Sequence, residues 1–273
     1  MSLTLLAELA LVGLVAGFVD AIAGGGGLLT LPALALAGLD PVAAVATNKL
    51  GGVFGSGSAT LAFARAGEID ARTMAEPALA ALLGSIVGAL ALPYAPRQAL
   101  AAALPLVLVV VALYFAFAPA MDERLSKARL TPRAYALTLA PAIGFYDGVF
   151  GPGAGSFYMI GFLALAGFGL IGAIASARIA NFGSNLGSLA VYALAGHILL
   201  APGLAIGAGQ FLGARLGARS AMRAGARLAR PLIVVVSCAM ALKLAIEPGA
   251  PLRQWLAPAL SATLACSFPL LLP

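Results

Sequence analysis

Apolar runs about 20 residues long follow one another along almost the whole chain, and this feature limits the possible folds most. A helix of about 20 apolar residues is long enough to cross the hydrocarbon core of a bilayer. Apolar residues make up 62% of the 273 residues and charged residues only 10%, whereas about 25% of a soluble domain is charged. Such a chain cannot cover a water-soluble domain of this size with polar side chains. The composition therefore predicts an all-α membrane protein and excludes a soluble enzyme, a nucleic-acid-binding protein and a disordered chain.

Six of the apolar runs are long enough to be full membrane spans. We predict them at residues 42–65, 72–93, 98–118, 171–195, 203–222 and 231–247. The C-terminal segment 252–273 is either a further short span or an interfacial segment.

Two other apolar regions are interrupted by glycine-rich breaks. The first region covers 3–22 and resumes over 28–38 after the glycines at 24–27. The second covers 134–150 and resumes over 156–168 after the break at 151–155. Because each second piece is too short to span a bilayer alone, we predict that each region is a re-entrant helical hairpin.

The chain contains an internal duplication. The sequence Gly-Phe-Val-Asp at 17–20 matches Gly-Phe-Tyr-Asp at 144–147, and after a two-residue shift Lys49 matches Arg178. We predict four segments: repeat 1 (1–118), a basic cytoplasmic linker (119–133), repeat 2 (134–248) and a hydrophobic C-terminal tail (249–273).

The basic residues indicate how the repeats are oriented. They cluster in 119–133 and 215–230, and clusters of this kind mark cytoplasmic loops. Each repeat has an odd number of crossings, whether its hairpin crosses the membrane or turns back within it, so the second repeat is expected to be inverted relative to the first. Inverted repeats with discontinuous helices are typical of secondary transporters.

The motifs around the two breaks resemble those of a known family. Residues 18–32 (FVDAIAGGGGLLTLP) and 46–50 (ATNKL), with 144–153 (GFYDGVFGPG) and 181–185 (NFGSN), are similar to the sulfite exporter TauE/SafE family, in its YfcA-like branch. The resemblance implies a multi-pass protein of the bacterial inner membrane. It also implies a transporter, not an enzyme, that moves small anions such as sulfite, sulfonates or related organic anions. Membrane lipid is an expected partner, nucleic acid is not, and assembly into a homo-oligomer is left open.

The glycine-rich breaks are candidate anion sites. A half-helix that begins inside the membrane presents free N–H groups and a partial positive charge, and glycine lets an anion approach the backbone. The alternative is that these glycines only allow close helix packing. The substrate-binding candidates at the breaks are Gly24, Gly25, Gly26, Gly27, Gly151, Gly153 and Gly155.

Two cations and two acids lie within apolar segments at equivalent positions of the repeats. A lone cation there is costly, so we expect Lys49 and Arg178 to neutralise a bound anion. The alternative is a pair of structural salt bridges, Asp20 with Lys49 and Asp147 with Arg178. Asp20 and Asp147 are also our candidates for carrying a coupling proton.

Further polar residues lie on the same helices as the two cations. Thr47, Asn48, Asn181 and Asn185 either donate to the oxygens of the anion or form interhelical hydrogen bonds. One histidine and two cysteines do not make a metal set, and we expect no cofactor. His197 is expected at the membrane interface, and the basic stripe of Arg215, Arg219, Arg223 and Arg227 at lipid headgroups or lining a vestibule.

The leading interpretation is a secondary transporter of small anions with a central site formed by both broken regions. The sequence has no GxxxxGK[ST] motif, so ATP is not expected to drive transport directly. The energy is expected to come from a gradient, a partner or the substrate concentration. A passive anion channel is the closest alternative, and an intramembrane enzyme is a weaker one.

Overall fold

The computed structural model describes residues 1–94 and 128–224, and the regular structure of these residues is helical throughout. The first described part holds α1 (Leu3–Ala23), α2 (Gly26–Leu36), α3 (Pro41–Arg65), α4 (Ala71–Ala91) and the short 3-10 helix η1 (Leu92–Tyr94). The second holds α6 (Pro132–Leu137), α7 (Leu139–Val149), α8 (Ala154–Ala164), α9 (Leu170–Leu194) and α10 (Leu200–Ala224).

The predicted spans in the described part correspond to these helices. The spans at 42–65, 72–93, 171–195 and 203–222 match α3, α4, α9 and α10, which confirms the all-α prediction. The spans at 98–118 and 231–247, the tail 249–273 and most of the linker 119–133 lie outside the described residues. The division of the chain into four segments therefore stays a prediction.

Both predicted breaks interrupt the helices near the expected residues. Gly24 ends α1 with φ 87° and α2 begins two residues later, whereas Gly151 and Gly153, with φ 96° and 76°, separate α7 from α8. These left-handed conformations favour glycine because it has no Cβ. The sequence did not predict a further interruption at Thr138, which divides 134–150 into α6 and α7. Pro141 follows, and proline has no N–H to continue the helical ladder from the preceding turn.

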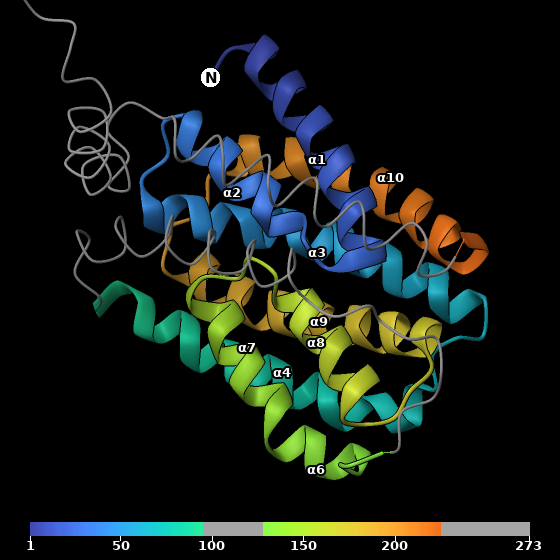
Figure 1. The fold of residues 1–273 in the computed structure, drawn as a ribbon. Helices are drawn as coiled ribbons and strands as arrows, with labels where there is room; N and C mark the ends of the chain where they lie inside the picture. Colours follow the sequence, from blue (N-terminus) through green and yellow to red (C-terminus); the bar gives the residue numbers. More distant parts are fainter. Residues whose placement is uncertain (95–127, 225–273) are drawn as a thin grey trace, which may run out of the picture.

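The two halves pack through two equivalent helix pairs. Figure 1 shows α1 beside α10 on one side and α4 beside α7 on the other, with α3 and α9 between them. Glycines bring the backbones of each pair together: a Cβ at Gly217 would lie 2.3 Å from the Phe18 carbonyl oxygen, and one at Gly88 would lie 2.2 Å from that of Phe145. Phe18 and Phe145 are 127 positions apart, and Gly88 and Gly217 are 129 apart, so the contacts follow the duplication found in the sequence.

The outer surface is strongly apolar. By length and apolar composition together, α1 and α4 qualify as candidate membrane spans among the described helices. The helices α3 and α9, which carry the buried Lys49 and Arg178, are 25 residues long, or about 37 Å at 1.5 Å per residue. Large apolar side chains are exposed on α1, α4 and α10, among them Leu11, Leu83, Val87, Leu90 and Leu212. An apolar surface of this extent is typical of contact with lipid.

Candidate functional site

The two breaks, which lie about 130 residues apart in the chain, contact each other directly. A Cβ at Gly24 would lie 2.1 Å from the backbone nitrogen of Ser156, and one at Gly155 would lie 3.0 Å from the Cα of Gly24. The Ser156 hydroxyl donates to the Ala23 carbonyl. The end of α1 and the start of α8 are therefore held together at the centre of the protein.

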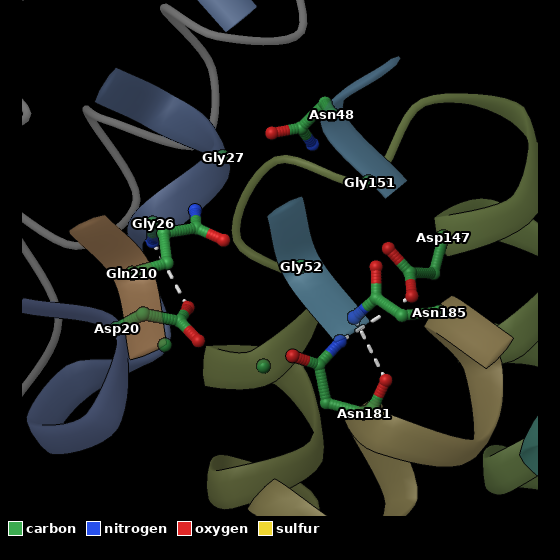
Figure 2. Close-up of a pocket in the computed structure, with 12 residues that line it drawn as sticks. Asp20, Gly26, Gly27, Asn48, Gly52, Asp147, Gly151, Asn181, Asn185 and Gln210 are labelled. Atoms are coloured by element: carbon green, nitrogen blue, oxygen red, sulfur yellow. Dashed lines mark hydrogen bonds between the residues drawn. The ribbon is translucent and has the colours of Figure 1, made fainter. Parts of the chain in front are cut away.

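A small polar cavity lies where the breaks meet α3, α9 and α10. Its volume is about 30 Å³, which is room for one or two water molecules. Figure 2 shows Asp20, Gly26 and Gln210 on one side of it and Asp147, Asn181 and Asn185 on the other. The lining residues are Asp20, Gly24, Gly26, Gly27, Asn48, Gly52, Asp147, Gly151, Gly155, Asn181, Asn185 and Gln210.

Lys49 makes a buried ion pair beside this cavity. It is the ninth residue of α3, it is fully buried, and its Nζ lies 2.6 Å from Asp147 Oδ1. The other carboxylate oxygen of Asp147 accepts from Ser184 and from Asn181, the latter at 3.3 Å. Three donors thus hold the Asp147 carboxylate, which is 2% exposed.

Arg178 makes the second ion pair and holds the two breaks together. It is the ninth residue of α9, is fully buried, and donates through Nη1 to Asp20 Oδ2 at 3.0 Å. Nη1 also donates to the Asp20 carbonyl at 2.6 Å, and Nη2 donates to the Gly155 carbonyl at 3.0 Å. Asp20 in turn accepts from the Gly26 N–H at 2.9 Å through Oδ1. A planar guanidinium can reach all these oxygens, whereas a lysine would act as a point charge.

The alternative pairing of Asp20 with Lys49 and Asp147 with Arg178 is wrong. Each cation pairs with the acid of the other half of the chain. Because α3 and α9 lie next to each other at the centre, each cation reaches across to the opposite break. The four groups together carry no net charge when both acids are ionised.

Some of the remaining candidate substrate-binding residues line the cavity and others do not. Asn48, Asn181 and Asn185 line the cavity, and Asn48 accepts from the Thr30 hydroxyl. Thr47 is not among the lining residues, because its hydroxyl accepts from the Leu199 N–H, at 3.1 Å, just before α10. Gly25 and Gly153 cap α2 and α8 and are also not among the lining residues.

Two lining residues were missed by the sequence analysis, Gly52 and Gln210. Gly52 is the equivalent of Asn181, and a Cβ there would lie 2.6 Å from Asn185 Oδ1. Gln210 is a buried polar residue in an otherwise apolar part of α10. The sequence signal that could have identified Gln210 was a glutamine in the middle of the predicted span 203–222.

The peripheral candidates lie away from the cavity. His197 is in the turn between α9 and α10, and Arg215, Arg219 and Arg223 are exposed on α10, whereas Arg227 is outside the described residues. Among residues 1–94 and 128–224, no group of three or more histidine, cysteine, aspartate or glutamate side chains is placed to hold a metal ion.

Comparison with known proteins identifies the family. The model of the sulfite exporter TauE/SafE family matches residues 9–244. The chain belongs to this family. No solved structure matches it.

Several curated relatives are similar over nearly their whole length. A probable membrane transporter protein, ORF9, of Sinorhizobium sp is 49% identical over 252 residues, which are 92% of this chain and 97% of the relative. The probable membrane transporter protein YfcA of Escherichia coli K12 is 42% identical, covering 92% of this chain and 94% of the relative. A probable membrane transporter protein of Haemophilus influenzae is 41% identical, covering 90% and 96%. Family and relatives thus indicate a transmembrane transporter rather than an enzyme.

Proposed function

We propose that this TauE/SafE family member is a secondary transporter of small anions such as sulfite, sulfonates or related organic anions. Of the two directions of transport, we propose export. The proposal rests mainly on one observation. Two fully buried cations, each the ninth residue of equivalent helices, lie at two backbone breaks that share one polar cavity. A buried cation is energetically costly inside a membrane, and here both cations lie beside a cavity that is lined by glycines of the two breaks and by asparagine side chains.

The charge balance suggests how an anion would bind. An anion that entered next to two intact ion pairs would leave a net negative charge in a buried site, which costs several kcal/mol. Protonation of Asp20 or Asp147 removes one negative charge and frees a cation for the substrate. Binding of a proton and release of a carboxylate from its cation would therefore accompany binding of the anion. Such a carrier exports the anion when the outward gradient of the anion exceeds the inward gradient of protons.

The size of the cavity suggests that the described conformation is closed. A volume of about 30 Å³ is too small for a sulfonate, so the ion pairs must separate before such a substrate fits. Arg178 bonds both breaks, and releasing Asp20 from it would loosen the contact between them. Opening of the site and exchange of a carboxylate for the substrate would then be one event.

The architecture that we propose is a pair of inverted repeats, each with a re-entrant hairpin and three spans, in the bacterial inner membrane. The equivalent contacts of α1 with α10 and of α7 with α4 support a pseudo-symmetric arrangement. The basic segments 119–133 and 215–230 would both face the cytoplasm.

The test is ligand binding followed by transport. Purified protein is heated with sulfite, sulfonates, sulfate and carboxylates in turn, and a ligand that binds the folded state raises the melting temperature. The anion identified in this way is then loaded into proteoliposomes with an imposed pH gradient. Arg178→Lys keeps the charge and loses the fork of donors. The loss in binding free energy for the anion should exceed the loss in free energy of unfolding. If none of these anions stabilises the protein, the proposal fails.

A passive anion channel would use the same cavity. Saturating flux at low turnover without single-channel current is expected of the transporter. Ohmic current through a bilayer that contains the purified protein would favour the channel.

A further inference from the structure

The two halves of the chain differ at several equivalent positions around the cavity, and one such pair is residues 81 and 210. A Cβ at Gly17 would lie 2.4 Å from the Gln210 carbonyl oxygen, and a Cβ at Gly144 would lie 2.3 Å from that of Ala81. Because Gly17 and Gly144 are equivalent in the duplication, the two contacts identify Ala81 as the counterpart of Gln210. One half of the protein therefore has a methyl group where the other has a carboxamide.

The carboxamide of Gln210 is buried and incompletely bonded. The residue is 3% exposed and lines the cavity, yet its Oε1 has no hydrogen-bond partner among the described residues. Leaving a buried polar atom without a partner costs about 1–3 kcal/mol, and most buried polar groups are bonded. An unbonded acceptor at the edge of a cavity is the arrangement expected when a ligand supplies the missing donor.

The neighbouring helix leaves room for this side chain. Cβ atoms at Gly51 and Gly55 would lie 3.1 and 3.2 Å from Gln210 Oε1, so larger residues on α3 would displace the carboxamide. The equivalent of Gly55 is Ser184, whose hydroxyl is used by Asp147. Among the buried side-chain atoms of the described residues that line the cavity, Gln210 Oε1 is the one without a hydrogen-bond partner.

We propose that Gln210 is a specificity-determining residue that accepts a hydrogen bond from the substrate. The favoured substrate would then be an anion that also carries a hydrogen-bond donor, such as a hydroxyl or an amine, near its charged group. The charged end would be held by Lys49 or Arg178, and Gln210 would bind the donor. This inference rests on the proposed function and adds the chemical class of the anion.

The test uses two probes that differ by one hydroxyl group, 2-hydroxyethanesulfonate and ethanesulfonate. We expect wild-type protein to bind the hydroxyl compound about three- to tenfold more tightly, the range for one net hydrogen bond. Gln210→Leu, which keeps a similar volume, should reduce this ratio to near one, because the hydroxyl group then has no acceptor. Gln210→Ala, which copies Ala81, is the second variant if the leucine side chain does not fit.

The matched control is Ser188→Ala, because Ser188 is also buried and its hydroxyl bonds only to the backbone of its own helix. This variant should keep the wild-type ratio. Equal binding of both probes by wild-type protein, or an unchanged ratio in the Gln210 variants, would overturn the inference and leave the proposed function standing. Failure of wild-type protein to bind sulfite or any sulfonate would instead overturn the proposed function and this inference with it.

Discussion

The crossed ion pairs predict a specific pattern of energetic coupling between the two halves of the chain. Lys49 is fully buried and its Nζ lies 2.6 Å from Asp147 Oδ1. Unit charges about 4 Å apart interact by about 4 kcal/mol at an effective dielectric constant near 20. Removal of one partner also leaves the other charge buried and unpaired, so Lys49→Met and Asp147→Asn should each cost about 3–5 kcal/mol.

The double variant separates the ion pair from the packing of its members. Lys49→Met combined with Asp147→Asn leaves no unpaired charge, so it should be more stable than the sum of the single changes predicts. We expect a coupling energy of about 2–3 kcal/mol, in the upper part of the range for residues in contact. Lys49→Met combined with Asp20→Asn is the matched control, because Asp20 pairs with Arg178, and its coupling should be clearly smaller.

The assay is thermal unfolding of the purified variants in one detergent at one pH. A loss of 3–5 kcal/mol corresponds to a melting temperature lower by about 6–20 °C for a chain of this size. If Lys49 coupled more strongly to Asp20 than to Asp147, the crossed arrangement and the charge balance derived from it would be refuted.

Three other predictions concern the break, the acids and the topology. Gly24→Ala should be much more destabilising than Gly38→Ala in the same melting assay. Both glycines have φ near 90°, but a Cβ at Gly24 would lie against the Ser156 nitrogen, whereas a Cβ at Gly38 would meet no atom within 4 Å. Equal losses of stability would mean that the two breaks do not touch. Replacing the acid that carries the coupling proton by asparagine should leave exchange of the anion in proteoliposomes intact and abolish its accumulation against a gradient, and unaltered pH dependence in both Asp20→Asn and Asp147→Asn would leave the acids a structural role. In a cysteine-free background, single cysteines at 126 and 195 should be labelled from opposite sides of the membrane, and labelling from one side would contradict inverted repeats.

Local features of the sequence predicted the long helices and the two breaks, but not the interruption at Thr138. The helices in the described part follow the apolar runs, because a segment in a bilayer must satisfy its own backbone hydrogen bonds. The breaks follow the glycines, because only glycine adopts the positive φ of Gly24 and Gly151 without strain. The duplication likewise identified Lys49 and Arg178 as equivalent residues before their surroundings were known.

The tertiary structure alone decided which groups meet at the centre. Asp20 and Arg178 are 158 positions apart, and nothing local to either residue shows whether a cation faces the break of its own half or the other. That choice depends on how α3 and α9 pack against each other, which brings each cation to the opposite break. The same packing leaves Gln210 Oε1 without a partner among the residues that the structure describes, since Gly51 and Gly55 on α3 offer it space but no donor side chain. Apolar patterns and glycines act through neighbouring residues and can be read along the chain, whereas the partner of a buried charge is settled only when distant helices pack.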